Sequence, residues 1–391
     1  MPKKSDPLLL IIPILLTGIG LLFIYSAGGS KFFLRQSIWF LISLFLLIII
    51  ARLLPRFLFV TAPPFYIGAI FLLIFTLLFA PTSPRRWLSL GVLSLQGSEL
   101  AKIATILMIG RYLSTCKRKG LIEIGTVFLF ALIPAFLVFA QPNLGSSVIF
   151  LIFPFVILLW DGVPLLTLLL ILSPLLSLIF SFSLYIWVPY IAFLSLYLLW
   201  RKEMIAFLTA VTSNSIVGLL TPLLWHGLKE YQRQRIIGFL APWIDPKGVG
   251  WQMIQSRIAF GSGRLIGKGI FAGTQKKLAF LPAPHTDFIV SVVGEAIGFV
   301  GIFLLLTLYL LLSLRILFLA RECRSRFASL VVIGIFGLLT YHWFVNIGVA
   351  IGILPVTGIP LPFVSYGGSS LLSFFIGIGI LISISRYRYE R

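Results

Sequence analysis

The chain has 391 residues, of which 59% are hydrophobic and 11% charged, and its formal net charge is +20. Soluble domains contain roughly 45–50% apolar and about 25% charged residues, so this composition excludes a soluble globular protein. The two cysteines, Cys116 and Cys323, lie beside clusters of Arg or Lys and receive no role. No pair of the three histidines has the spacing of zinc ligands, so no structural metal site is predicted.

Long apolar runs dominate the chain, and spanning the hydrocarbon core of a membrane takes roughly 20 such residues in a helix. Helices are required because lipid cannot satisfy the hydrogen bonds of a bare backbone. The sequence therefore predicts an all-α, polytopic transmembrane bundle of about 10–12 spans in a single membrane domain, residues 1–391, with one large extracytoplasmic loop at 226–285. The expected apolar segments are 8–27, 34–54, 57–80, 98–114, 124–140, 146–160, 163–184, 186–200, 205–225, 286–319, 328–351 and 365–385.

Two features of these segments need comment. The first run is too long for the apolar part of a signal peptide, so we interpret it as a span. The stretch 163–224 allows two alternatives, three short spans or one span with re-entrant pieces. Both contain an odd number of crossings, so the segments that follow keep the same orientation.

The basic residues of the short connections predict the orientation, because loops rich in Lys and Arg stay in the cytoplasm. With the N-terminal lysines inside, nearly every other basic short connection falls on the same side; Lys31 and Arg35 are the weak exception. Both chain termini are therefore expected in the cytoplasm. The short connection 81–97 and the long loop 226–285 are expected outside.

Both outer regions are basic, against the usual charge rule. Arg85 and Arg86 lie in the short connection close to the membrane, and the long loop carries many more Lys and Arg than acids. Long loops cross the membrane regardless of charge, which is one explanation for the second region. The alternative is that the outer face binds an anion. A phosphate-bearing lipid is the obvious candidate, since Arg forks match phosphate oxygens.

Acidic residues are scarce, and three of them are predicted at the outer side: Glu99, Asp287 and Glu295. Asp287 precedes a predicted span, so either Thr286 or Asp287 could cap that helix. The position of Asp287 among basic loops also suits a general base that acts on a lipid-linked substrate. Glu295 lies deeper in the same span and is expected in a buried pair or hydrogen bond with a neighbouring span.

Two further patterns suggest contacts with an anion. Lys102 follows Glu99 by three residues, so the two share a helix face, and either they form an ion pair or Lys102 faces a substrate phosphate. Residues 354–370 contain three prolines and three glycines at membrane depth, where irregular backbone must be buried in protein or line a cavity. The amides that open the last span could hold an anion, or the turn could serve packing alone.

A series of motifs runs in one order from the third span to the last. They are Arg85-Arg-Trp-Leu-Ser-Leu-Gly91, Ser98-Glu-Leu-Ala-Lys102, Gln141-Pro-Asn-Leu-Gly145, Tyr231-Gln-Arg-Gln-Arg235, Asp245-Pro-Lys-Gly-Val-Gly250, Gly267-Lys-Gly269, His285-Thr-Asp-Phe288, Asn346-Ile-Gly348 and Leu354 to Ser370. In these motifs the chain resembles the SEDS proteins (shape, elongation, division and sporulation). Pro355-Val-Thr-Gly-Ile-Pro360 looks like the elongation branch. The chain departs from the family pattern at Gly97, and Asn143, Ala283 and Ala296 replace acidic residues of that pattern.

The resemblance implies a peptidoglycan glycosyltransferase of the bacterial cytoplasmic membrane that serves cell elongation and rod shape. Its substrate would be lipid II, a disaccharide-pentapeptide on undecaprenyl pyrophosphate. The reaction would join the glycan of one lipid-linked molecule to the 4-hydroxyl of the next lipid-linked molecule and release the pyrophosphate lipid. Asp287 would be the catalytic base, or a ligand of a divalent cation such as Mg²⁺ or Mn²⁺. The expected substrate-binding residues are Arg85, Arg86, Trp87, Lys102, Arg233, Arg235, His285, Ser365, Gly367, Gly368 and Ser369, with Glu99 and Glu295 in support.

The expected partners are lipid II, a class B penicillin-binding transpeptidase, other membrane proteins of the elongation complex and membrane lipid, with no nucleic acid. Two alternative functions remain: a flippase for the same lipid, since a broken terminal helix suits transport, and a non-catalytic scaffold of the cell-wall complex. A flippase needs charge along a path through both leaflets. The notable acids and bases of this chain instead cluster at the predicted outer face.

Overall fold

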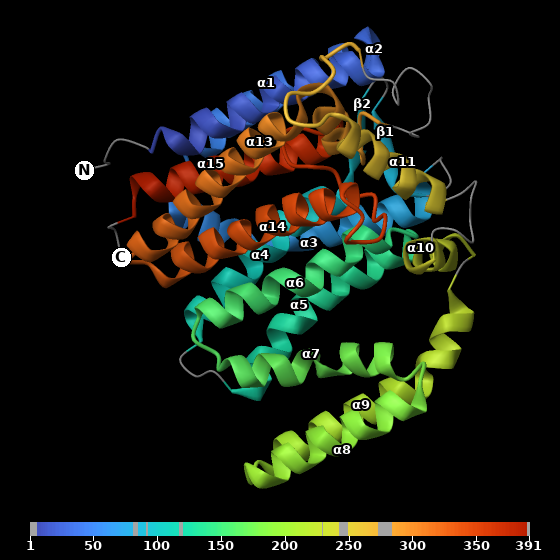
Figure 1. Cartoon of the computed structure of the whole chain (residues 1–391). Helices are drawn as coiled ribbons and strands as arrows, with labels where there is room; N and C mark the ends of the chain where they lie inside the picture. Colours follow the sequence, from blue (N-terminus) through green and yellow to red (C-terminus); the bar gives the residue numbers. More distant parts are fainter. Residues whose placement is uncertain are drawn as a thin grey trace. The chain divides into compact units, whose positions relative to one another are not determined.

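The computed structural model describes residues 6–80, 85–90, 93–116, 120–228, 230–241, 249–272 and 284–388. Each of the twelve predicted apolar segments is a helix, so the helical bundle is confirmed (Figure 1). The helices are α1 (Leu8–Gly28), α2 (Ser30–Ile50), α3 (Pro55–Phe79), α4 (Gly97–Thr115), α5 (Leu121–Ala140), α6 (Leu144–Trp160), α7 (Leu165–Phe180), α8 (Leu184–Trp200), α9 (Met204–Gly227), α10 (Glu230–Leu240), α11 (Val249–Ser262), α13 (Ile289–Glu322), α14 (Arg326–Ala350) and α15 (Gly368–Arg386).

Eight of the helices in the described ranges are long and apolar enough to cross a membrane. Three others, α6, α7 and α8, are apolar but have only 16 or 17 residues. The remaining predicted span, α4, carries Glu99, Lys102 and Arg111 within its 19 residues. Between residues 163 and 225 the chain forms the three helices α7, α8 and α9, of which α9 is long enough to cross a membrane and α7 and α8 are shorter. The two predicted alternatives for this stretch both stay predictions.

The short connection before α4 contains a β-hairpin that the sequence analysis did not predict. Strands β1 (Trp87–Leu90) and β2 (Leu93–Gln96) are antiparallel, with Trp87 opposite Gln96 and Leu90 opposite Leu93. The alternation of leucine and serine in both strands has the period of two that is typical of strands. The hairpin leads directly into α4 and so fixes where that helix begins.

The chain divides into two compact units: unit 1 is Met1–Ile157 with Gly238–Arg391, and unit 2 is Leu158–Ile237. Unit 2 contains α7, α8 and α9, and buried polar side chains join its helices. Asn214 Nδ2 donates to Ser173 Oγ (2.7 Å), and Ser177 Oγ donates to the carbonyl of Asn214 (2.7 Å). These bonds tie α7 to α9. The single membrane domain proposed from the sequence stays a prediction.

Unit 1 is built around α15. In the apolar stretch of α15, 94% of the residues are buried, against 22% in the neighbouring α2. Small residues let the helices approach one another, as is common between membrane helices. Gly379 of α15 lies against Ile50 of α2, and Gly334 of α14 lies against Ile106 of α4. Protein therefore surrounds α15, whereas α2 keeps one face toward lipid.

Helix α13 is broken at Gly298, whose backbone (φ 69°, ψ −159°) is not helical. The chain after α11 returns to this break: the amide of Lys268 donates to Glu295 O (2.9 Å), and that of Phe299 donates to Arg264 O (2.8 Å). Gly298 has a positive φ and lies against the backbone of Leu265, so a side chain there would be strained and crowded. The nine residues before the break thus form a short, buried half-helix that follows Asp287.

The segment of residues 351–367 between α14 and α15 has no helix and lies largely buried within unit 1. This observation confirms the prediction that irregular backbone at this depth is enclosed by protein. Gly20 of α1 makes room for it: a Cβ at Gly20 would come within 2.6 Å of the carbonyl of Val364. The segment brings the prolines and glycines of the last motif close to Asp287.

Candidate functional site

Asp287 lies half-buried in a turn of residues 284–288, called here the Asp287 turn, just before α13. The N-cap position of α13 is Phe288, which makes no side-chain capping hydrogen bond. Thr286 and Asp287 lie just before that position, and a capping role for either residue stays a prediction.

Three hydrogen bonds hold the backbone of the Asp287 turn, one at each of three successive carbonyl groups. The donors come from α14 and from the 351–367 segment. They are Tyr366 N to His285 O (2.8 Å), Ser365 Oγ to Thr286 O (2.7 Å) and Asn346 Nδ2 to Asp287 O (3.2 Å). Because these donors lie on neighbouring elements, the position of the turn depends on tertiary packing as well as on its own sequence.

A glycine faces the Asp287 carboxylate. A Cβ at Gly358 would lie 3.8 Å from Asp287 Oδ2, and Gly358 has a positive φ of 72° that favours glycine. The neighbouring residue Thr357 places its carbonyl against Gly145 at the start of α6. The turn around Gly358 therefore lies between α6 and the carboxylate and borders the space next to Asp287.

The imidazole of His285 packs between two aromatic rings. Its centroid is 4.1 Å from that of Phe32 and 5.5 Å from that of Tyr366. Burial lowers the pKa of His285 below its usual value of 6.5, because desolvation penalises the charged form. The ring is therefore neutral at pH 7 and adds no charge to the Asp287 turn.

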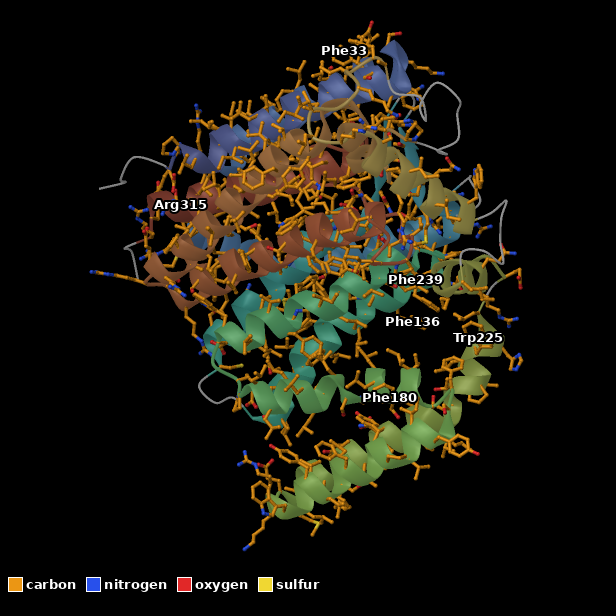
Figure 2. The ribbon with its side chains drawn as sticks, viewed as in Figure 1. Phe33, Phe136, Phe180, Trp225, Phe239 and Arg315 are labelled. Atoms are coloured by element: carbon orange, nitrogen blue, oxygen red, sulfur yellow. The ribbon has the colours of Figure 1, made fainter. Side chains whose placement is uncertain are left out.

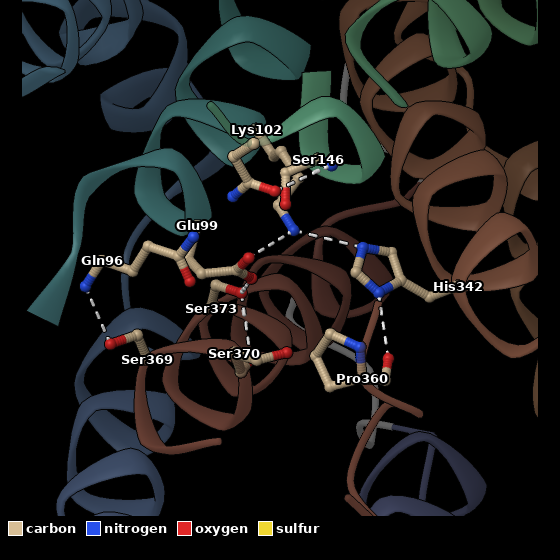
Figure 3. A network of polar contacts seen from close by, with 10 residues as sticks. Gln96, Glu99, Lys102, Ser146, His342, Pro360, Ser369, Ser370 and Ser373 are labelled. Atoms are coloured by element: carbon tan, nitrogen blue, oxygen red, sulfur yellow. Dashed lines mark hydrogen bonds and ion pairs between the residues drawn. The ribbon is translucent and has the colours of Figure 1, made fainter. Parts of the chain in front are cut away.

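A second cluster, called here the buried network, lies inside unit 1 where α4, α14 and α15 meet (Figure 3). Lys102 Nζ is 2.8 Å from Glu99 Oε1 and 3.1 Å from His342 Nε2, and Ser373 Oγ donates to Glu99 Oε2 (3.1 Å). The lysine must donate to Nε2, so the His342 proton resides on Nδ1, which donates to Pro360 O (3.2 Å). The network thereby reaches the 351–367 segment that holds the Asp287 turn.

The ion pair predicted for Glu99 and Lys102 is present, and the two residues are only 2% and 1% exposed. The contact of Lys102 with a substrate phosphate stays a prediction. Such a contact requires the ligand to reach below the hairpin into the bundle. Glu295 is buried and pairs with Lys268, whose Nζ is 3.3 Å from its Oε1. Lys268 lies in the connection after α11 and is partly exposed, so the partner does not come from a neighbouring span as predicted.

Arg85 and Arg86 precede strand β1 and donate to the ends of helices. Arg85, which is exposed, donates Nη1 to the carbonyl groups of Leu77 and Leu78 at the end of α3 (3.3 Å each). Arg86, half-buried, donates Nε to Gln141 O (3.0 Å) and Nη2 to Pro142 O. Trp87 is 37% exposed at the start of β1. The two guanidinium groups are thus fixed at the same edge of unit 1.

The polar groups that open α15 already have protein partners. Gly367 N donates to Gln36 Oε1 (3.2 Å), and Ser369 Oγ accepts from Gln96 N and donates to Ser94 O (2.9 Å each). Gly368 has no room for a Cβ because Trp39 lies against it. The turn therefore packs against α2 and strand β2. Anion binding at Gly367, Gly368 and Ser369 stays a prediction.

The remaining predicted residues lie elsewhere or outside the described part. Arg233 belongs to unit 2, where Nε donates to Trp225 O (3.0 Å) and Nη2 to His226 O (2.5 Å) at the end of α9. The side chain of Arg235 and the whole of Ala283 lie outside the described residues.

The family model described as cell cycle protein, which covers FtsW, RodA and SpoVE, matches residues 7–390. The chain belongs to the SEDS family. The peptidoglycan glycosyltransferase MrdB of Escherichia coli strain K12 is 36% identical over 390 residues, covering 98% of this SEDS chain and 94% of MrdB. The peptidoglycan glycosyltransferase RodA of Treponema pallidum is 34% identical over 431 residues, covering 97% of each.

Two solved structures share the SEDS bundle. A chain of a peptidoglycan synthase complex that coordinates polymerization and crosslinking matches with a TM-score of 0.76 and 30% identity, covering 99% of both chains. RodA, the rod shape determining protein of Thermus thermophilus, matches with a TM-score of 0.67 and 26% identity, again over 99% of both. The predicted polytopic SEDS architecture is confirmed by these matches.

The sequence analysis assigned no role to several residues that the SEDS structure places in the site. Gln36 is fully buried on α2 and bonds both sides of the turn before α15, through Ser365 O (3.3 Å) and Gly367 N (3.2 Å). His342 and Asn346 are buried polar residues on the apolar helix α14. A polar residue within a span is costly and usually functional, and that signal could have identified all three.

The described residues do not build a metal site in this SEDS protein. No group of three or more His, Cys, Asp or Glu side chains comes together in the ranges that the structure covers. Magnesium is commonly held by one or two carboxylates together with substrate phosphates, so Asp287 alone would need the substrate to complete a site. A divalent cation at Asp287 would therefore take its other ligands from the substrate, and its binding there stays a prediction.

Proposed function

We propose that this SEDS protein polymerises lipid II into glycan strands at the outer face of the bacterial cytoplasmic membrane during cell elongation. The chain is a multi-pass membrane protein and a peptidoglycan glycosyltransferase, by its family and its MrdB and RodA relatives. The observation that carries the proposal is the Asp287 turn, which three tertiary hydrogen bonds hold at its carbonyl groups.

The proposed reaction joins two lipid-linked glycans. The 4-hydroxyl of the acceptor attacks the anomeric carbon of the donor sugar, and its proton passes to the Asp287 carboxylate. A glycosidic C–O bond forms as the bond to the pyrophosphate oxygen breaks, and the leaving group departs as undecaprenyl pyrophosphate. A hydroxyl is a poor nucleophile at neutral pH, so a positioned base raises the rate.

The tethers on the turn explain how the base is positioned. A catalytic group contributes most when its geometry is fixed before the substrate arrives, because the entropic free energy of ordering the group then adds nothing to the activation barrier. Asn346 also donates Nδ2 to Ile359 O (2.7 Å), next to the Gly358 turn that faces the carboxylate. The same amide thus links the base to the wall of its site.

The leaving pyrophosphate needs cations, for which Arg85 and Arg86 are the first candidates. Arg85 is exposed, and its two described bonds both use Nη1. A planar guanidinium matches phosphate oxygens with two parallel hydrogen bonds. Trp87 is the next residue and is exposed enough to meet a sugar or lipid.

The test uses purified full-length protein with its transpeptidase partner and lipid II as the substrate. We expect glycan polymer, detected as a ladder on a gel. A protein that acts only as a flippase or a scaffold would leave lipid II unpolymerised, and that result would decide against the proposal. The match to a chain of a peptidoglycan synthase complex supports the choice of a class B penicillin-binding transpeptidase as partner.

The proposal also requires the Asp287 end of the bundle to lie outside the cell. In a background with Cys116→Ser and Cys323→Ser, we expect Ile266→Cys to react with an impermeant maleimide added to intact cells. Ile122→Cys, on the opposite predicted side, should react only after permeabilisation. Ile266 and Ile122 are both 81% exposed, so accessibility within the fold is matched. The reverse pattern would exclude cytoplasmic termini.

Arg86→Ala should slow polymerisation about tenfold or more, because one charge-assisted hydrogen bond to a phosphate is worth about 1.5–3 kcal/mol. The measurement is the initial rate of glycan synthesis over a range of lipid II concentrations, at equal protein amounts. Arg111→Ala is the control, since Arg111 also donates to helix carbonyls, those of Phe59 and Val60. Equal rates for the two variants would rule out a special role for Arg86.

A further inference from the structure

The segment Ile359-Pro-Leu-Pro362, called here the proline stretch, has few backbone donors of its own, because its two prolines lack an N–H group. Side chains from neighbouring helices bind three of its four carbonyl groups. These bonds are Asn346 Nδ2 to Ile359 O (2.7 Å), His342 Nδ1 to Pro360 O (3.2 Å) and Tyr309 Oη to Pro362 O. The position of the proline stretch therefore depends on side chains of α13 and α14.

The proline stretch and the Asp287 turn share two of their hydrogen-bonding partners. The Asn346 amide that binds the stretch also donates to the turn, at Asp287 O (3.2 Å). Ser365 Oγ accepts from Leu361 N in the stretch (2.9 Å) and donates to Thr286 O in the turn (2.7 Å). The glycine that faces the carboxylate directly precedes the stretch. A shift of the proline stretch would therefore disturb both the tethers of the turn and the wall of its site.

Apolar contacts join the same two segments. Ile359 of the proline stretch and Phe288 of the Asp287 turn lie in one buried cluster with Val345 of α14. Phe239 of α10 packs against this cluster (Figure 2). Closely packed interiors transmit displacements, because they leave few voids into which side chains can relax. We therefore expect a small shift of the proline stretch to reach the carboxylate.

His342 connects the proline stretch to the buried network. It is 2% exposed and lies one turn before Asn346 on the same face of α14. Its Nε2 accepts a bond from Lys102 Nζ (3.1 Å), as Figure 3 shows. Glu99 already balances the charge of Lys102, so the ion pair does not require a histidine. What His342 adds is a donor for the proline stretch.

We propose that His342 is a positioning residue for the glycosyl transfer. Its Nδ1–H fixes the carbonyl of Pro360, and the proline stretch transmits this restraint to the Asp287 turn through Asn346 and Ser365. The inference rests on the proposed role of Asp287 as the base, and it gives His342 no contact with the substrate. A misplacement of about 1 Å at a reacting group can cost about a hundredfold in rate, so a base held less firmly lowers kcat.

Two substitutions separate the roles of the two ring nitrogens. Asparagine places its amide near the position of Nδ1 and keeps a donor for Pro360, whereas glutamine reaches the position of Nε2 and keeps an acceptor for Lys102. With lipid II as the substrate, His342→Gln should lower kcat about tenfold or more and leave KM within about twofold of the parent value. His342→Asn should keep kcat within about threefold of the parent, because the bond to Pro360 remains.

A second measurement does not depend on activity. Hydrogen exchange at the backbone amides of Leu361 and Tyr366, followed by mass spectrometry in detergent, reports on their bonds to Ser365 Oγ and His285 O. Both amides should exchange faster than in the parent when position 342 carries glutamine. They should exchange at the parent rate when it carries asparagine.

The control is Thr340→Val, which removes from α14 a buried hydroxyl that makes no hydrogen bond within the described ranges. It should change neither kcat nor exchange. If His342 served only to stabilise the fold through Lys102, the asparagine variant would be the more damaged of the two, and that order would overturn the proposal. Parent values of kcat and exchange in His342→Gln would also overturn it.

Two further outcomes are decided in the same way. If His342→Gln does not fold, His342→Asn carries the test: parent-like kcat supports the proposal, and a loss beyond about threefold together with faster exchange contradicts it. If the parent protein makes no polymer from lipid II, the proposed function is wrong. The exchange pattern then decides by itself whether His342 fixes the turn.

Discussion

Replacing Asp287 with Asn should lower the rate of polymerisation about 10²–10⁴-fold, the usual cost of removing a general base. The variant should still fold and insert, because the three hydrogen bonds on the Asp287 turn go to backbone carbonyl groups and not to the carboxylate. Asparagine keeps the size of the side chain but removes its charge and basicity. The measurement is the rate of glycan synthesis from lipid II with purified protein.

The control for this variant is Glu203→Gln, which removes a carboxylate in unit 2 that forms a long ion pair with Arg201 (3.9 Å). It should keep the parent rate. Ser365→Ala is informative in addition, since it removes one tether of the turn and should reduce kcat more than it raises KM. A near-parent rate for Asp287→Asn would mean that another group takes the proton.

Lys102→Met should destabilise the protein strongly. The substitution leaves Glu99 buried without its cation, and breaking one side of a buried ion pair costs about 3–5 kcal/mol. Glu99 would keep only the hydroxyl of Ser373, and His342 would lose the donor to its Nε2. The measurement is the thermal unfolding midpoint in detergent, followed by the yield of folded protein.

The double variant Glu99→Gln/Lys102→Met should recover much of the lost stability, because no charge is then left unpaired. Arg201→Met is the control for an exposed pair, which is worth at most about 1 kcal/mol. A drop in the midpoint for Lys102→Met no larger than that for Arg201→Met would show that the buried network does not stabilise the fold.

The sequence predicted the helices well because the hydrophobic segments are long and lipid allows few other structures. Asp287 and the irregular turn before the last helix were also predicted, because scarce acids and clustered prolines at a membrane boundary are strong local signals. The hairpin was missed although Trp87 to Gln96 contains a period of two, because the pattern is short and was interpreted as loop. Charge could not decide between three short spans and one span with re-entrant pieces for 163–224, since both alternatives leave the following segments on the same sides of the membrane.

Long-range partners could not be predicted. Nothing near Gly298 in the sequence indicates that residues 264–269 return to the break in α13, because that packing joins segments about thirty residues apart. The partner of Lys102 was predicted only as far as Glu99, three residues away. His342 lies 240 residues further along the chain, and only the assembled bundle brings it to the lysine.

The burial of α15 has a consequence for how the protein is made. Translation proceeds from the N-terminus, so α2 and α4 enter the membrane long before α15 is synthesised. Until then Gln36 lacks Ser365 and Gly367, and Glu99 lacks Ser373. An unpaired polar side chain in lipid raises the free energy of the inserted helix. Until α15 is made, these side chains must therefore be shielded from lipid by other helices or by an insertion factor. A chain truncated before residue 368 would therefore lack the helix around which unit 1 is built.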